Sequence, residues 1–342
     1  MIFSRDLGID LGTANTRIYA SGRGIVLREP SVVAVDKNTG KTLAVGSAAR
    51  NMLGRTPGNI VALRPIQGGV ISDYDMTAKM LGYFLKKIIR YSLVKPRVVV
   101  SVPSGISEVE ERAVIQAAME AGARRVYLIE GPLAAALGAN LDVSGPSGHL
   151  VVDIGGGTTD IGVLSVSGVA ASSSIKVAGD ALDEAIIKFV RRRFGVVIGV
   201  NTAEEIKTNV GCVVERDEEV RMLSKGRDLK TGLAREFTVT STDMLEALKR
   251  PVRQITDEVL AVLEQTSPEL VADISKNGIV LTGGGSQLFG MAQLLSERTE
   301  VACTTADDAD SCVAFGCGKS LQWMNLMQEG TLNLARKRLM RE

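Results

Sequence analysis

The sequence predicts an α/β protein made of two related halves. Three glycine-centred turns, at residues 10–13, 153–159 and 282–286, support this prediction. Each turn follows a short apolar run of β-strand character, so each is expected at the carboxyl end of a strand. The first two turns share one layout, in which a strand, a hydroxyl-rich glycine turn and a second strand follow each other. This shared layout indicates an internal repeat.

The length and composition of the chain fit two hydrophobic cores. With 342 residues the chain is long for a single core. Hydrophobic residues make up 45% and aromatic residues 4%, so aliphatic cores are expected. The formal net charge of +1 gives no general attraction to nucleic acid, and no nucleic-acid partner is expected. No apolar stretch approaches the ~20 residues that span a bilayer, so the protein is expected in the cytoplasm.

The remaining elements follow from apolar spacing and turn residues. In the first half we expect a hairpin over 6–20, strands over 24–35 and 97–103, and helices over 73–90 and 107–121. Ser107 and Glu110 have the spacing of a capping box at the start of the last of these helices. In the second half we expect strand, turn and strand over 150–165, helices over 181–194, 202–213 and 242–265, and a charged surface subdomain over 215–237. Pro251 is expected to interrupt the longest helix.

The glycine turns carry groups that bind phosphate in proteins. Glycine lets backbone N–H groups close around a phosphate without a Cβ clash, and nearby hydroxyls add hydrogen bonds. The third turn precedes a helical pattern, so its N–H groups are expected to point into the same space. A single turn could equally be a plain connection after a strand, whereas three in this order predict a nucleotide cleft. The expected contacts are Gly12, Thr13, Ala14, Asn15, Gly155, Gly156, Gly157, Thr158, Gly283, Gly284, Gly285, Ser286 and Gln287.

Two aspartates indicate a magnesium site in this cleft. Asp10 and Asp153 each stand where a strand leads into a glycine turn. Two carboxylates at such a place suit a hydrated Mg²⁺, which keeps several waters and bridges phosphate oxygens. We therefore expect Asp10 and Asp153 to hold the metal that accompanies the nucleotide.

These segments resemble the two phosphate motifs and the adenosine motif of the actin superfamily and, within it, the MreB family of bacterial actin homologues. The resemblance covers almost the whole chain and extends beyond the nucleotide motifs, which separates the chain from sugar kinases and DnaK-type chaperones. Its most specific stretches lie at residues 7–16, 28–34, 54–60, 102–106 and 226–233.

The resemblance implies an actin-like fold of two α/β halves, each with a small inserted subdomain, closing on ATP and Mg²⁺. It assigns residues 1–31, 66–144 and 310–342 to subdomain IA, 32–65 to IB, 145–180 and 243–309 to IIA, and 181–242 to IIB. It also implies that Glu204, Glu205, Ile206 and Lys207 lie on the helix that flanks the adenosine. Spacing alone leaves open a plain surface ion pair between Glu204 and Lys207.

The resemblance further implies a filament protein of paired, antiparallel protofilaments on the inner face of the cell membrane. Such filaments organise cell-wall synthesis and rod shape together with membrane proteins of the wall-elongation machinery. Two alternatives remain open from the sequence. One is an assembly partner that binds nucleotide without turnover and co-polymerises with an active paralogue, and the other is a soluble ATPase of the same fold.

One departure from the family pattern concerns hydrolysis. The family has two glutamates before a proline, and the second helps to position the attacking water, but here the segment reads Glu130, Gly131 and Pro132. Loss of a water-positioning group slows phosphoryl transfer, which depends mainly on positioning. Glu130 is a poor substitute because a shift of one residue turns a side chain by ~100° in a helix. Thr158 is the second candidate, and we expect weak ATP hydrolysis, with a loop shift that brings Glu130 to the water as the alternative.

A second local feature concerns the membrane. Leu93 and Val94 lie between basic residues in the segment 90–95. Exposed aliphatic side chains with flanking Lys and Arg can enter an anionic lipid interface, and many copies along a filament strengthen a weak contact. We expect Leu93 and Val94 to touch the membrane, with a buried loop as the alternative.

Overall fold

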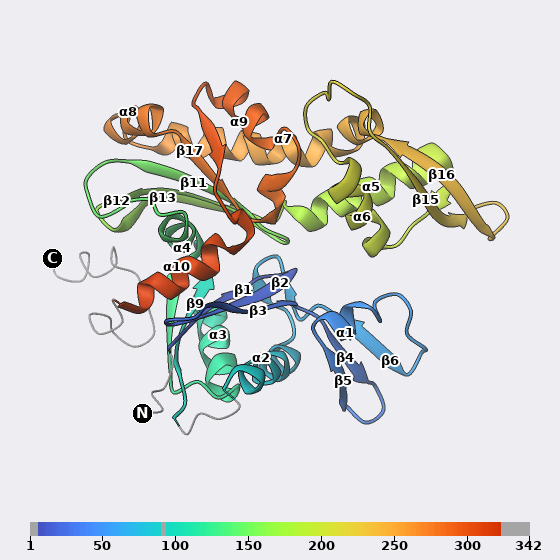
Figure 1. The fold of residues 1–342 in the computed structure, drawn as a ribbon, viewed down its shortest axis with the longest axis horizontal. Helices are drawn as coiled ribbons and strands as arrows, with labels where there is room; N and C mark the ends of the chain where they lie inside the picture. The colour runs from blue at the N-terminus through green and yellow to red at the C-terminus, as the bar shows by residue number, and fades with distance from the viewer. Residues whose placement is uncertain (1–5, 90–93, 323–342) are drawn as a thin grey trace.

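The computed structural model describes residues 6–89 and 94–322, which form two α/β halves, one above the other in Figure 1. Each half contains one five-stranded mixed sheet and one small sheet of three strands. The basic segment at residues 331–339 of the sequence therefore lies outside the described residues. The predicted fold class, α/β with two related halves, is confirmed.

The large sheet of the first half contains β1 (Leu7–Leu11), β2 (Asn15–Ala20), β3 (Gly24–Pro30), β9 (Arg97–Val102) and β10 (Arg125–Glu130), in the order β10-β9-β1-β2-β3. β1 pairs antiparallel with β2 and parallel with β9, so the predicted hairpin and buried strand are confirmed. The helices α2 (Tyr74–Ile88) and α3 (Glu108–Glu120) pack their apolar faces on this sheet. The capping box of Ser107 and Glu110 is also present.

The large sheet of the second half repeats this arrangement. It contains β11 (His149–Ile154), β12 (Thr159–Ser165), β13 (Gly168–Ile175), β17 (Ile279–Thr282) and β18 (Cys303–Thr305), in the order β13-β12-β11-β17-β18. β11 pairs antiparallel with β12 and parallel with β17, just as β1 pairs with β2 and β9. The helices α7 (Ser241–Gln265), α8 (Pro268–Asn277) and α9 (Met291–Thr299) accompany this sheet (Figure 1). The internal repeat predicted from the first two glycine turns therefore extends over five strands.

Two short helices connect the halves by exchange. α4 (Gly131–Gly138) follows β10 of the first sheet, and α10 (Cys312–Ser320) follows β18 of the second sheet, after the short helix η2 (Ala309–Ser311). α10 packs on β1 and β2, whereas α4 packs on β11 and β12. Each sheet is thus covered by the helix that leaves the other sheet. We call this arrangement the helix exchange.

The two exchanged helices cross where both carry glycine. A Cβ atom added at Gly316 of α10 would lie 1.7 Å from the carbonyl oxygen of Ala134. A Cβ atom added at Gly138 of α4 would lie 1.8 Å from the carbonyl oxygen of Cys312. Backbone therefore touches backbone at the crossing, and no larger residue fits at either glycine.

The small sheets stand at the same end of the two halves (Figure 1). The first small sheet contains β4 (Val33–Asp36), β5 (Thr42–Val45) and β6 (Ile60–Leu63), with α1 (Ser47–Arg50) beside them. The second small sheet contains β14 (Val196–Val197), β15 (Arg221–Asp228) and β16 (Ala234–Thr240). The helices α5 (Gly179–Phe194) and α6 (Val200–Val210) accompany the second sheet. A short hairpin of β7 (Ile66–Gln67) and β8 (Val70–Ile71) leads back from the first small sheet to α2. The boundaries of the four subdomains stay a prediction.

One local prediction needs correction. Pro251 does not interrupt its helix, because α7 continues through it from Ser241 to Gln265. The proline side chain is buried between the buried Leu248 and Val252, so packing of the apolar face offsets the missing backbone hydrogen bond. The helix expected after the third glycine turn is confirmed, since the turn leads through the 3₁₀ helix η1 (Gly284–Gln287) into α9.

Candidate functional site

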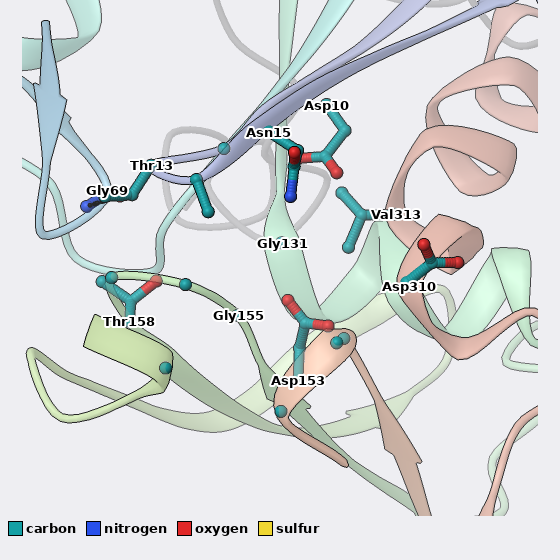
Figure 2. Close-up of a pocket in the computed structure, with 18 of the residues that line it drawn as sticks. Asp10, Thr13, Asn15, Gly69, Gly131, Asp153, Gly155, Thr158, Asp310 and Val313 are labelled. Carbon is teal, nitrogen blue, oxygen red and sulfur yellow. Dashed lines mark hydrogen bonds between the residues drawn. The ribbon is translucent and has the colours of Figure 1, made fainter. Parts of the chain in front are cut away.

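A cavity of about 330 Å³ lies between the two halves (Figure 2). The three glycine turns meet at its wall. Residues of β1, β2 and β11 line its wall together with Gly131 and Gly179, the first residues of α4 and α5. Most of the predicted contacts line it, namely Asp10, Gly12, Thr13, Ala14, Asn15, Asp153, Gly155, Gly156, Gly157, Thr158, Glu204, Lys207, Gly283, Gly284, Gly285 and Gln287.

The tips of the first two turns face each other at close range. A Cβ atom at Gly157 would lie 2.3 Å from Thr13 Oγ1, and one at Gly156 would lie 2.6 Å from the Cβ of Ala14. The turn of the β7–β8 hairpin closes the same region, since Gly69 donates its N–H to Thr13 Oγ1 over 3.0 Å. Glycine at the second tip is therefore a steric requirement of the approach between the halves.

The third turn lies against the end of β11. Gly283 has a φ of 80°, and a Cβ atom there would lie 2.3 Å from the carbonyl oxygen of Ile154. Ser286 is buried and donates its hydroxyl to the carbonyl of Gly283 over 2.7 Å, so this residue shapes the turn and does not line the cavity. Gln287 and the three glycines do line it.

The predicted residues of α6 divide into two groups. Glu204 and Lys207 line the cavity, whereas Glu205 is exposed and Ile206 is buried in the core. Glu204 accepts a hydrogen bond from Arg50 of α1 over 2.5 Å. Lys207 pairs with Asp183 over 2.8 Å and donates to a carbonyl of α5. Each of the two therefore has a partner from another element, in place of the simple surface pair that spacing allowed.

The two predicted metal ligands both project into the cavity (Figure 2). Burial raises the pKa of Asp10 to about 6, against the opposing effect of the Arg17 guanidinium. Burial raises the pKa of Asp153 to about 7, although Thr282 donates a hydrogen bond to it over 2.7 Å. Buried carboxylates of this kind favour a nearby cation.

This donor set fits Mg²⁺ better than a metal held by protein alone. Among the described residues, no group of three or more His, Cys, Asp or Glu side chains is arranged to hold a metal ion. Two carboxylates that face an open cavity leave positions for water and for oxygens of a bound ligand, which is the usual environment of Mg²⁺.

The residues proposed for hydrolysis occupy different surroundings. Gly131 opens α4 at the cavity wall, and a Cβ atom there would meet only Val102 O at 3.5 Å and Asp160 Cγ at 4.0 Å. Thr158 lines the cavity and donates its hydroxyl to Asp160 Oδ2 over 2.8 Å. Glu130, in contrast, does not line the cavity, and its carboxylate accepts a hydrogen bond from Ser104 over 3.2 Å. The space beside Gly131 is large enough for a longer side chain.

Sequence reasoning missed several lining residues, among them Arg17, Gly69, Asp160, Gly179 and Asp310. Strand pairing contained a signal for two of them. Arg17 lies directly opposite Asp10 in the first hairpin, and Asp160 lies directly opposite Asp153 in the second. Both positions are found by counting seven residues from the aspartate through the turn. Asp310 comes from a distant segment, and local pattern gives no signal for it.

The predicted membrane pair is described only in part. Leu93 lies outside the described residues, and Val94 is 40% exposed. None of the helices in 6–89 and 94–322 has the length and apolarity that crossing a bilayer requires.

The geometry agrees with comparisons to known proteins. Residues 4–329 match the family described as MreB/Mbl protein. The chain belongs to the MreB/Mbl family. It is 50% identical to the cell shape-determining protein MreB of Escherichia coli K12 over 331 residues, which cover 95% of each chain. It is 48% identical to the cell shape-determining protein Mbl of Bacillus subtilis 168 over 335 residues, covering 97% of this chain and 100% of that protein.

Solved structures show the same fold. MreB5 of Spiroplasma citri bound to AMPPNP superposes with a TM-score of 0.90 at 35% identity, over 94% of this chain and 97% of that one. The MamK double helical filament superposes with a TM-score of 0.81 at 22% identity, over 94% of this chain and 99% of that one. This member of the MreB/Mbl family therefore has the actin-like fold that the sequence predicted.

Proposed function

We propose that this protein is an ATP-binding, cell shape-determining filament protein that acts at the inner face of the cell membrane. The observation that carries the proposal is the meeting of three glycine turns and two partly buried aspartates in one cavity between the halves. MreB5 of Spiroplasma citri in complexes with AMPPNP and ADP, at 35% identity, supports nucleotide binding. The curated relatives named for cell shape support the cellular role.

In this proposal each part of the cavity binds one part of ATP. The N–H groups of the first two turns bind the β- and γ-phosphates. Gly283, Gly284, Gly285 and Gln287 bind the adenosine from one side, and Glu204 and Lys207 of α6 bind it from the other. Asp10 and Asp153 hold Mg²⁺, which neutralises phosphate charge when it is bound. The close approach of the two tips limits access of water to the phosphates.

We further propose that ATP hydrolysis is slow because Gly131 leaves an open space where a glutamate would orient water. Thr158 remains at the cavity wall as a group that can accept a hydrogen bond from the water, since its own hydrogen is donated to Asp160. Glu130 is held away from the cavity by Ser104 and is not favoured for this role. The same space supports the second candidate function, an assembly partner that binds ATP without turnover and co-polymerises with an active paralogue.

The test is phosphate release during filament assembly on anionic vesicles. We expect Gly131→Glu to release phosphate at least tenfold faster than the natural protein, because water positioning dominates the rate of phosphoryl transfer. Gly145→Ala, whose Cβ atom meets nothing within 4 Å, is the matched control for an added side chain. Equal rates in all three proteins would show that the space at Gly131 does not limit hydrolysis.

Assembly separates the candidate functions. A filament protein forms polymer by itself with ATP, and an assembly partner forms polymer only when an active paralogue is added. A soluble ATPase of the same fold forms no polymer under either condition. Its rate of phosphate release per molecule of protein does not change with protein concentration. Sedimentation and electron microscopy with ATP, ADP and no nucleotide distinguish these results.

Membrane attachment through Leu93 and Val94 is a separate part of the proposal. We expect the double replacement of Leu93 and Val94 by serine to lower co-sedimentation with anionic vesicles at least tenfold, since the contact is repeated along the filament. Val166→Ser, which changes a valine that is 51% exposed on another loop, is the control. Unchanged sedimentation of the double variant would contradict attachment through Leu93 and Val94. Contacts with membrane proteins of the wall-elongation machinery rest on family membership.

A further inference from the structure

The carboxylate end of the cavity has an unusual charge balance. Five acidic residues line the cavity, namely Glu204 on α6 and the four aspartates Asp10, Asp153, Asp160 and Asp310. Among the described residues that line the cavity, the cations are Arg17 and Lys207. Lys207 belongs to α6 and is paired with Asp183, so Arg17 is the cation among the four aspartates. A triphosphate placed here meets acidic groups and needs compensating positive charge.

Arg17 is held in position but keeps hydrogen-bonding capacity. Its side chain is 14% exposed, and its Nη2 donates to Asp310 Oδ2 over 2.6 Å. Its Nη1 lies 3.7 Å from Asp10 Oδ2, which is too long for a hydrogen bond. Its Nε is buried and has no hydrogen-bond partner. A guanidinium has five N–H donors in a planar fork, so several are available to an anion.

The fold itself does not require an arginine at this position. In the second half, the residue that pairs with the strand-end aspartate is Asp160, an acid in a backbone setting equivalent to that of Arg17. Arg17 is also expensive to bury, because a charged side chain with an unpaired Nε loses hydration. Arg17 forms ion pairs with Asp310 and Asp10, but these pairs do not use all of its N–H donors, so the guanidinium keeps donors for a ligand in the cavity.

We propose that Arg17 is a phosphate-binding residue that supplies fixed positive charge beside Asp10 and makes nucleotide binding less dependent on Mg²⁺. Guanidinium groups bind phosphate oxygens with two parallel hydrogen bonds, which are stronger than neutral ones. Asp310 is the positioning residue, because its hydrogen bond fixes the guanidinium at the cavity wall. This inference rests on the proposed function, since it presupposes a bound nucleotide.

The test measures the affinity of a fluorescent ATP analogue with excess Mg²⁺ and again with EDTA. We expect chelation to weaken binding to the natural protein by about tenfold or less, and binding to the Arg17→Leu variant by about 100-fold, because the variant without Mg²⁺ has no cation beside the four aspartates to offset the phosphate charge. Arg28→Leu is the matched control. Arg28 is exposed, pairs with Arg17 in the β2–β3 register and does not line the cavity, so this variant should behave like the natural protein.

The Arg17→Lys variant keeps the test decisive if the leucine variant does not fold. Lysine keeps the positive charge and removes only the planar guanidinium, which can form two parallel hydrogen bonds. We define the chelation ratio as the affinity for the analogue with Mg²⁺ divided by the affinity with EDTA. We expect the ratio of Arg17→Lys to lie between those of the natural protein and Arg17→Leu. Equal ratios in the natural protein and both Arg17 variants would overturn the inference while leaving nucleotide binding intact. If the natural protein fails to bind the analogue even with Mg²⁺, the proposed function itself fails, and the inference fails with it.

Discussion

The two halves of the molecule share a backbone plan and differ in the charge that they present to the cavity. In the first hairpin, the residue opposite the strand-end aspartate is Arg17, and in the second hairpin it is Asp160. The first half therefore pairs its aspartate with a cation, whereas the second half places a second acid next to its aspartate. An internal repeat can thus keep its strand order while its two copies take on different chemical tasks.

The helix exchange is the feature that the two halves share most strictly, and its disruption should give the largest effect. We expect Gly316→Val to lower the free energy of unfolding by more than about 4 kcal/mol, because its Cβ atom would overlap the Ala134 carbonyl. Urea denaturation, or the soluble fraction if the variant precipitates, measures this loss. Gly138→Val should behave in the same way, since the contact is reciprocal. A variant at either glycine with natural stability would show that the helices separate easily.

Replacement of the two strand-end aspartates should have different effects in the two halves, because, in the described part of the chain, only Asp10 has a cation beside it. We expect Asp153→Asn to weaken the apparent affinity for Mg²⁺ at fixed nucleotide by about 100-fold and Asp10→Asn by about tenfold, because the guanidinium of Arg17 already offsets part of the charge of Asp10. Titration of each variant with Mg²⁺ at fixed nucleotide measures both losses. Equal losses would mean that the difference at positions 17 and 160 does not reach the metal.

The ion pairs across the cavity mouth should matter least to stability. Arg50 of α1 pairs with Glu204 of α6, but the Arg50 side chain is 37% exposed. We therefore expect Arg50→Ala to change the free energy of unfolding by less than about 1 kcal/mol in the absence of nucleotide. Thermal unfolding with and without ATP measures the change in stability and shows whether the ion pair contributes more when nucleotide is bound. A loss as large as that of Gly316→Val would contradict the view that helix packing joins the halves.

Much of the fold followed from patterns that are local in the chain. Alternation and turn residues predicted the two hairpins, and spacing of apolar side chains predicted α2, α3 and α5. The prediction at Pro251 failed because the cost of a proline inside a helix is local, while the burial that offsets it depends on tertiary packing. The helix exchange was not predicted, because contacts between Ala134 and Gly316 join segments far apart in sequence.

The candidate site shows the same division. Residues that belong to glycine turns were found, since the turn itself marks them. Arg17 and Asp160 were missed although strand register determines their position. Both lie on the return strand of a hairpin, beyond the last glycine or hydroxyl residue of the turn. Ser286 and Ile206 were included because they are adjacent in sequence to lining residues, but their side chains turn into the core. Proximity in sequence is a weaker guide than strand register for residues near a turn.

The helix exchange has a consequence for biosynthesis. The cover of the first sheet, α10, is made from residues 312–320, close to the end of the described chain. Translation proceeds at about 5–20 residues per second, and Val99, Tyr127 and Ile129 of the first sheet share a core cluster with Val313 and Cys317 of α10. This face of the first sheet therefore lacks α10 for roughly tens of seconds after β1 has been made. A ribosome-bound chain that stops before residue 312 therefore carries an uncovered sheet, and the second half of the molecule must emerge before the first can be completed.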